Sequence, residues 1–389
     1  MPQGESNRVS VKISKETVWN ETPSSPTMLN LPYTNDTLTH NKRTKQSDVL
    51  RSDRMRDSQL QVGYNAEGDI NFELRFTDFE SILEVALAST FTTQSTTGAG
   101  TSNNFNFAAA GGGVQVITGP SNWTNNYNVG AWVRVKSAAQ TANNGVFKIT
   151  AKTSTTLTVN NSAGVLEATS TATVVTKNLR NGTTKQSFLI EKQFNDLTNN
   201  FVQYRGMRVS GLSLNITSEE IVTGAVRFLG ARGVLATATV AGGTTAASSN
   251  ESMTASVNVG TINEAGVSLT TAIKSITLDL NNNARALMGV GSASAIGINL
   301  GSIQITGRVE AYFEDQALLT KVINHTSSSL DFRCTDAAGN VFVFTIAQVR
   351  FSGHPQNPGI DQDVMLPLDF ASEREPTNNF MIQVDALAP

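Results

Sequence analysis

The chain has 389 residues, of which 39% are hydrophobic and only 16% are charged. This length exceeds what one small core needs, so the sequence predicts two or three domains built from short strands and turns rather than a helical bundle. A formal net charge of −3 offers no strongly basic surface, which argues against a protein that grips nucleic acid. The single cysteine, Cys334, excludes an internal disulfide framework and a cysteine-based zinc site.

The opening residues, MPQGESNRVSVK, are polar, and no apolar run approaches the ~20 residues of a membrane helix. We therefore expect neither a signal peptide nor a membrane span, and a soluble protein made in a cytoplasm. Apolar and polar residues alternate over residues 9–13, which predicts a first strand.

Residues 21–63 have a different texture. They contain Pro23, Pro26 and Pro32, followed by the charged run KRTKQSDVLRSDRMRD, and no period persists. The sequence predicts a long irregular loop here, and a loop of this length is usually functional or ordered by a partner.

Alternation returns over residues 70–76, and apolar residues then recur at three and four positions over residues 79–87, so a strand and a short helix are predicted. A low-complexity bridge extends to Gly113. From residue 114 to 175 the runs VQVI, AWVRV, GVFKITA, TLTV and TATVV alternate with turn residues. Five strands in so short a stretch indicate a small antiparallel barrel or sandwich.

Further strands are predicted on both sides of a linker with the sequence ATATVAGGTTAASSNES. They fall at residues 188–191, 207–216, 221–229, 275–280, 302–313, 330–334, 341–346 and 364–370. Cys334 ends one of these alternating apolar runs, which predicts a buried thiol rather than a nucleophile.

The two ends of the chain resemble each other. RFTDFESILEVA (75–86) aligns with YFEDQALLTKVI (312–323) at an offset of 237, with Phe76 on Phe313. EIVTGAVRFLG (220–230) aligns with QDVMLPLDFAS (362–372) at an offset of 142, with Phe228 on Phe370. The difference, 237 − 142 = 95, is extra length in the first half, and the bridge and the small β-domain occupy it.

A duplicated module with an insert follows from these offsets. The first module is predicted at 1–110 and 178–235, the insert at 111–177, a linker at 236–272 and the second module at 273–389. Because the second module lacks the insert, we expect the insert to be a decoration that the module fold does not require.

Three stretches resemble phage tail tube (major tail) proteins: 68–89, 178–216 and 307–353. The insert, over residues 129–159, is similar to the small β-domain that such proteins often carry. The resemblance covers most of the chain, and it rests on the order and spacing of these stretches rather than on one motif.

This resemblance implies a mainly β fold: two tandem barrel or sandwich modules, each with a short helix, plus the small inserted β-domain. It implies self-assembly into rings that stack into a hollow tube for DNA ejection, and the duplication matches the members that form trimers with pseudo-sixfold symmetry. The implied partners are other copies of the chain and the tail tape measure, tail terminator and tip proteins, with DNA only in transit. The implied location is the virion tail, after assembly in the host cytoplasm.

Two sets of residues are candidates for these roles. Acidic walls repel DNA, so the polar face of the duplicated strand is a candidate lumen lining, with an ordinary solvated face as the alternative. This set is Asp69, Asn71, Glu73 and Glu310. The long loop matches a segment that reaches across ring interfaces in the family, and its cations are mixed with three aspartates, which favours a protein contact over phosphate binding. This set is Lys42, Arg43, Lys45, Arg51, Arg54 and Arg56.

No catalytic, metal or cofactor site is predicted, and we expect no enzyme. The three histidines are unrelated in spacing, and no phosphate-binding loop, nucleophile elbow or dinucleotide motif occurs. The pairs Glu219–Glu220 and Asp361/Asp363 resemble glycosidase acids only in composition, and solvated turns are the favoured interpretation.

Two other functions remain open at this point. A surface adhesin or carbohydrate-binding protein is suggested by the Thr/Ser/Asn-rich strands and by Trp123, Tyr127 and Trp132, although core aromatics of the insert are the favoured interpretation. An adhesin also predicts a secretion signal or fibre repeats, which the sequence lacks. A secreted glycosidase ranks third.

Overall fold

The computed structural model describes residues 4–92, 95–97, 105–255, 263–264, 267–268, 272–314, 316–356 and 359–389. The fold is mainly β, as predicted, with the short helices α1 (Glu80–Ala86) and α3 (Ala317–Ile323). The predicted first strand is β1 (Val9–Lys15), which pairs with β15 (Phe188–Phe194).

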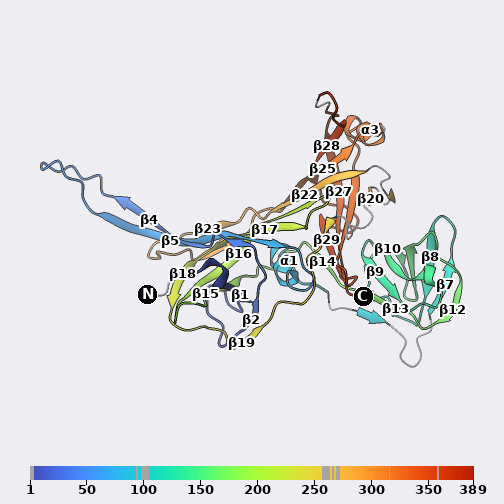
Figure 1. The fold of residues 1–389 in the computed structure, drawn as a ribbon, viewed down its shortest axis with the longest axis horizontal. Helices are drawn as coiled ribbons and strands as arrows, with labels where there is room; N and C mark the ends of the chain where they lie inside the picture. The colour runs from blue at the N-terminus through green and yellow to red at the C-terminus, as the bar shows by residue number, and fades with distance from the viewer. Residues whose placement is uncertain are drawn as a thin grey trace.

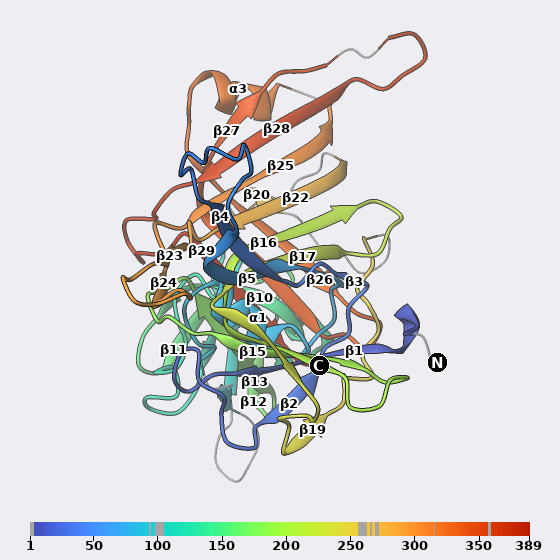
Figure 2. The same ribbon diagram turned by 90° about the vertical axis from the view of Figure 1, so that its left-hand side faces the viewer.

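A curved antiparallel main sheet runs through both halves of the chain, and Figure 2 shows its strands fanning out one after another. Its order is β4 (Thr39–Gln46), β5 (Gln59–Glu73), β17 (Thr223–Gly230), β16 (Phe201–Thr217), β22 (Ile273–Asn281), β25 (Gln304–Tyr312), β28 (Met365–Ser372) and β27 (Val341–Gly353).

Two strands of the main sheet, β16 and β27, also build a second layer. The first half of β16 pairs with β15 and β18 (Arg232–Ala236). The first half of β27 pairs with β26 (Ser328–Thr335) and β29 (Ile382–Leu387). Short strands complete the edges: β14 (Asn178–Arg180) pairs with β29, and β19 (Gly243–Thr245), inside the predicted linker, pairs with β2 (Thr27–Asn30).

The predicted duplication appears as a repeated topology. The order β15–β16–β17–β5, followed by α1, recurs as β26–β27–β28–β25 with α3 following β25. The helices are 237 residues apart, and β17 and β28 are 142 apart. At the same two offsets, left-handed backbone occurs at Ala88 (φ 48°) and His325 (φ 51°), and at Glu219 (φ 65°) and Asp361 (φ 60°).

One detail of the alignment changes. The amides of Leu74 and Phe313 donate to the carbonyls of Val222 and Val364 respectively, so the structure equates Leu74, rather than Phe76, with Phe313. The strand offset is therefore 313 − 74 = 239, and two extra residues lie between strand and helix in the first module.

The apolar face of the main sheet, the second layer and both helices share one core. Ile70, Leu214, Leu278 and Leu368 from four different strands belong to it together with Leu83 of α1. Cys334 is fully buried in this core, as predicted, and burial raises the pKa of its thiol to about 12.

The prediction of an irregular loop at 21–63 was wrong. This stretch contains β2, β3 (Asn35–Asp36), β4 and the start of β5, and β4 and β5 form a hairpin that projects far from the body, with its turn at 47–58 (Figure 1). We call residues 39–65 the long arm. β4 is polar along its length, and in the arm part of β5 the apolar alternation is limited to Leu60 and Val62, which are 58% and 51% exposed because no core lies against them. So short an alternation does not reveal a strand in the sequence.

The insert lies at the opposite end of the molecule from the long arm (Figure 1). The described residues of the insert form eight strands in the order β12-β7-β8-β11-β10-β9-β13-β6. They are β6 (Ser95–Thr97), β7 (Phe105–Ala109), β8 (Val114–Thr118), β9 (Trp132–Lys136), β10 (Gly145–Lys152), β11 (Thr156–Asn160), β12 (Glu167–Ser170) and β13 (Thr173–Thr176). The predicted boundary at 111 falls too late, since β6 and β7 precede it within the presumed low-complexity bridge. The rest of that bridge, 93–94 and 98–104, lies outside the described residues.

Candidate lumen face and assembly edges

One face of the main sheet is polar. The antiparallel register sets Asp69, Asn71 and Glu73 of β5 opposite Arg227, Ala225 and Thr223 of β17. From there the register carries the same face across the remaining strands through Ser213, Asp279, Thr306 and Glu310. The four residues predicted to line a lumen therefore lie on one face of one sheet.

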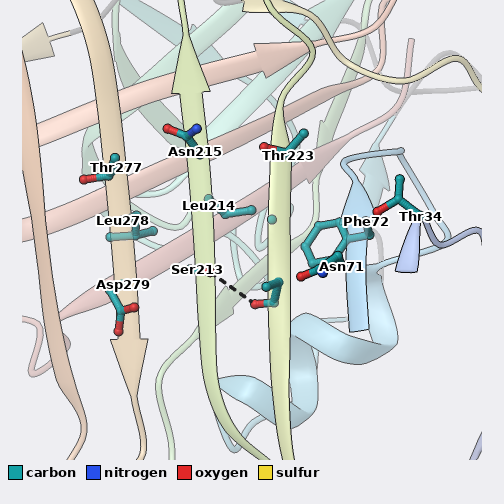
Figure 3. A pocket seen from close by; sticks show the side chains of 12 residues that line it. Thr34, Asn71, Phe72, Ser213, Leu214, Asn215, Thr223, Thr277, Leu278 and Asp279 are labelled. Carbon is teal, nitrogen blue, oxygen red and sulfur yellow. Dashed lines mark hydrogen bonds between the residues drawn. The ribbon is translucent and has the colours of Figure 1, made fainter. Parts of the chain in front are cut away.

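The opposite face is apolar and covered. Ile70 and Phe72, which alternate with the polar residues of β5, are buried, and the Phe72 ring stacks on Phe79 beside α1 with ring centres 4.2 Å apart. The polar face instead carries a shallow hollow of about 470 Å³. Figure 3 shows Asn71, Thr223, Asn215, Thr277 and Asp279 around it on neighbouring strands.

The arginines of the polar face each have a carboxylate partner. Arg227 Nη2 lies 2.8 Å from Asp279 Oδ1. Arg308 lies 3.5 Å from Glu310 and 3.9 Å from an oxygen of Asp369. Arg350 Nε donates to Glu373 at 2.7 Å. These pairs are half exposed, so they add little stability, but they mask the cations.

Carboxylates outnumber cations at the register positions of this face. They are Glu67, Asp69, Glu73, Asp279, Glu310 and Asp369, against Arg227, Arg308 and Arg350. The face is therefore acidic, with its arginines already paired, and it offers a DNA backbone repulsion rather than binding sites.

The sheet joins the two modules through one internal junction and ends in two open edges. At the junction the second half of β16 pairs with β22, from Gly211 opposite Asn281 to Thr217 opposite Ser275. Among the described residues, 350–353 of β27 pair only with β28, and β3 and β4 pair only with β5. Such edges present unpaired N–H and C=O groups that can pair with another chain.

The first open edge corresponds to β22. Asn35 and Thr39 lie opposite Asn71 and Glu67 of β5. Adding 239 to the β5 positions gives 310 and 306, whose partners on β22 are Ser275 and Asp279. The β3–β4 segment therefore holds in the first module the place that β22 holds in the second, at an offset of 275 − 35 = 240.

The predicted loop cations all lie on the long arm. Lys42, Arg43 and Lys45 are on β4, and Arg51, Arg54 and Arg56 are in its turn. Arg51 Nη2 bonds Asp53 at 2.9 Å, which lowers the pKa of that carboxyl. Sequence reasoning missed the apolar side chains beside them, above all Leu50, which is 98% exposed, with Val49 and Met55. The sequence could not show that these side chains are exposed, because a hairpin that packs against no core has too little periodicity by which to recognise it.

The three insert aromatics are buried, which contradicts a sugar-stacking platform. Trp123 and Tyr127 pack in the insert core with ring centres 5.3 Å apart, as the core interpretation predicted. Trp132 differs, because it packs on Val341 and Val343 of the second module and donates from Nε1 to Thr345 Oγ1 at 3.0 Å.

Charged groups reinforce this contact between insert and second module. Lys148 Nζ lies 2.8 and 3.1 Å from the two carboxylate oxygens of Asp331, whose side chain is 1% exposed. The guanidinium of Arg333 lies 4.4 Å from the Trp132 ring centre. Asp385 nearby is fully buried, and burial raises its pKa to about 7. The insert is therefore packed onto the second module by a buried and charged interface.

The side chains that could bind a metal or act in catalysis do not form a cluster among the described residues. Within the described part of the chain, no group of three or more His, Cys, Asp or Glu side chains is arranged to hold a metal ion. Among the same residues, no helix is long and apolar enough to cross a membrane. Glu219, Glu220, Asp361 and Asp363 are exposed in two connections between strands, as the turn interpretation predicted.

A duplicated antiparallel sheet with an exposed acidic face, arginines paired with carboxylates and two open edges defines a mainly β structural protein whose edges can pair with another chain. A family model described as phage tail tube protein matches residues 6–372, nearly the whole chain. The chain belongs to this phage tail tube family. No curated protein matches it. Membership makes it a structural protein of the bacteriophage virion, located in the tail, where it assembles into a tube with other tail components.

Proposed function

We propose that three copies of the chain close into a ring with pseudo-sixfold symmetry, and that rings stack into a hollow conduit for DNA ejection. The observation that supports this is the junction between β16 and β22. This junction joins the two modules inside the chain. The two open edges correspond to its two strands, because β27 is the repeat of β16 and the β3–β4 segment is the counterpart of β22. An open edge of one chain then pairs with the other open edge of the next, and the ring closes when the rotation fits.

The repeat predicts the register of this contact. The amide of Asn282 donates to the carbonyl of Ser210 at the internal junction. With the repeat offset of 142, the counterpart of Ser210 in the second module is Ser352. With the offset of 240 between β3–β4 and β22, the counterpart of Asn282 in the first module is Lys42. We therefore expect Ser352 of one chain to lie opposite Lys42 of the next.

The geometry suits a DNA conduit. The eight strands of the main sheet, from each of three chains, give 3 × 8 = 24 strands. At a spacing of about 4.8 Å and a tilt of about 40°, they enclose a barrel about 50 Å across, wider than a DNA duplex. In this arrangement Asp69, Asn71, Glu73 and Glu310 line the lumen, because the covered face carries the helices and the second layer.

The other roles follow from this assembly. The subunit contacts tape measure, terminator and tip proteins in the tail, meets DNA only in transit, has no catalytic role and assembles in the host cytoplasm. The insert, at the far end of the molecule from the long arm, lies on the outer wall.

Cysteine cross-linking tests the ring. The variant Ser352→Cys/Lys42→Cys is oxidised after assembly and run on a denaturing gel without reductant. Circularly linked trimers are expected, and each single variant should stay monomeric on the gel because Cys334 is buried. Ser213→Cys/Asp279→Cys, opposite each other at the internal junction, is the positive control and should link within one chain. Six linked chains, or assembled tubes without any link between chains, would contradict the proposal.

A further inference from the structure

The insert is attached to the first module at one place but packs on the second module. Its two connections to the body lie side by side, because the amide of Thr92 donates to the carbonyl of Asn178 at 2.8 Å. Its strands β9 and β10 lie against β26, β27 and β29 of the second module, beside the C-terminus (Figure 1). A narrow neck on one module and a side-chain contact on the other are the parts of a clasp.

The surface under the insert has a counterpart in the first module that is also covered. This surface is the face of the second layer that is turned away from the shared core. Glu191 and Gln203 lie on it in the first module, and there the linker closes it. The carboxylate of Glu191 accepts hydrogen bonds from the hydroxyl of Thr239 and, at 2.8 Å, from the amide of Val240. The first module therefore needs a segment from elsewhere in the chain to complete this face.

The insert does the same for the second module. The repeat offset places Arg333 (191 + 142) and Thr345 (203 + 142) at the equivalent positions. Arg333 donates to the carbonyl of Val146 on β10 at 3.1 Å, and Thr345 accepts the indole N–H of Trp132 on β9 at 3.0 Å. The insert is therefore the cover of this face of the second module, in the place that the linker holds in the first.

A carboxyl group at this contact is enclosed and incompletely bonded. Asp385 lies on the covered face of β29 and has no exposed surface. Its Oδ2 accepts from the side-chain amide of Gln383 at 2.6 Å, while its Oδ1 is buried with no hydrogen-bond partner among the described residues. Glu191, buried to the same degree, accepts from three groups. Burial raises the pKa of Asp385 to about 7, and the negative charge of Asp331 adds to the rise.

The cations that face Asp385 are each bonded to another group. From β14, Arg180 donates to Gln383 at 2.7 Å, and from β10, Lys148 pairs with Asp331 of β26. The other cations are Arg333 of β26, bonded to Val146, and Arg134 and Lys136 of β9, bonded to the carbonyls of Gly339 and Pro389. The acids Asp336 and Glu375 face Arg134 and Arg180. β13 and residues 341–346 of β27 contain no charged residue.

We propose that the insert is a proton-dependent clasp, which is closed on the second module while Asp385 is protonated and loosens when Asp385 ionises. Ionisation places a charge with an unbonded oxygen in a closed contact, beside Asp331 and the apolar side chains of Val341 and Val343. Burying a charge without bonds is costly, and water reaches this one when the insert moves away. The inference goes beyond the ring and does not depend on it, since it concerns a contact within one chain.

The three tryptophans of the chain report separately on the clasp, the insert and the body. The indole N–H of Trp132 donates across the clasp to Thr345. That of Trp123 donates within the insert to the carbonyl of Thr155 at 2.8 Å, and that of Trp19 donates within the first module to the carbonyl of Gly206 at 3.2 Å. The measurement is the exchange rate of each indole proton by NMR at pH 5 and pH 8, in the full-length subunit before assembly. Each rate is divided by that of free indole at the same pH, which gives a protection factor.

The protection factor of Trp132 should fall roughly 100-fold from pH 5 to pH 8, because opening becomes about tenfold more favourable for each pH unit below the raised pKa of Asp385. The protection factors of Trp123 and Trp19 should stay constant. In Asp385→Asn, which has the shape of the protonated acid, Trp132 should be equally protected at both pH values. Glu191→Gln, which changes the fully bonded carboxylate of the equivalent layer, is the control and should keep the wild-type fall at Trp132.

Three outcomes would overturn the proposal. The first is equal protection of Trp132 at both pH values in the wild-type chain. The second is an unchanged fall in Asp385→Asn, which would assign the pH dependence to another group. The third is an equal loss at all three tryptophans, which would mean that the subunit unfolds as a whole and has no clasp that opens. The comparison of the three tryptophans within the wild-type chain decides the matter even if Asp385→Asn fails to fold.

Discussion

The contact between insert and second module depends on Lys148, and its removal should loosen the insert. Asp331 is fully buried, and the ammonium of Lys148, 2.8 Å from its carboxylate, supplies its direct ion pair. The change Lys148→Met keeps the length of the side chain but leaves a buried charge without that partner. Breaking a buried pair in this way costs about 3–5 kcal/mol.

The lower end of that range applies here. Lys148 is 17% exposed, and the Arg333 guanidinium contributes a second positive field near Asp331, so part of the charge stays compensated. A loss of about 3 kcal/mol corresponds to roughly a 150-fold shift toward the undocked insert, at 1.4 kcal/mol per factor of ten.

Amide hydrogen exchange measures this shift. Protection of β9 and β26, which lie at the contact, should fall by about two orders of magnitude in Lys148→Met, while the insert core around Tyr127 keeps its protection. The double variant Lys148→Met/Asp331→Asn should recover most of the protection because the unpaired charge is gone. Lys136→Met, which removes an exposed cation that donates to the backbone oxygen of Pro389 at 2.7 Å, is the control. Equal protection in Lys148→Met and wild type would refute the reasoning.

Three further predictions concern pH, the arm and catalysis. The pKa of Asp385 is about 7 in the folded protein, against 3.8 for the ordinary carboxyl. Between these two values the folded state keeps a proton that the unfolded state releases. The free energy of unfolding should therefore fall by about 4 kcal/mol as the pH rises from 4 to 7. Urea titrations should therefore show that Asp385→Asn stabilises the protein at pH 8 and not at pH 4; equal effects at both would contradict this. Replacing 47–58 with a two-residue turn, which spares the strands of the main sheet, should leave rings in light scattering and remove long tubes in microscopy. Purified protein should show no turnover of glycans or nucleic acid, and activity lost on changing Glu220 or Asp361 would be decisive against a purely structural role.

The fold could be predicted from the sequence where a helix or strand buries one face, because its apolar residues then recur at regular intervals. The helix at 80–86 and its repeat at 317–323 were found because one apolar face repeats at three and four positions. The alignment of 220–230 with 362–372 identified β17 and β28 correctly, since both strands put alternate residues into the core.

The parts that failed lack such a signal. The long arm is solvated on both faces, so β4 has no apolar alternation and the arm part of β5 has only the short one of Leu60 and Val62. The three prolines before the arm also suggested irregular structure. Trp132 was assigned to the insert core because composition cannot tell an aromatic that fills its own domain from one that packs on a neighbour. The register of the main sheet brought Asp69 and Glu310 to one face as expected, whereas Asp279 and Asp369, on strands without a distinctive polar pattern, needed the structure.

The two modules differ in one instructive way on the acidic face. In the first module Asp69 of β5 lies opposite Arg227 of β17. At the equivalent positions of the second module, 69 + 239 = 308 and 227 + 142 = 369, Arg308 lies opposite Asp369. The pair is present twice with its signs exchanged, so the identity of the charge at each position is not what the fold requires. A role in stability is weak for pairs this exposed. What both arrangements share is an arginine held by carboxylates on a face with an excess of negative charge, and that is the property that a surface needs if DNA is to pass along it without binding.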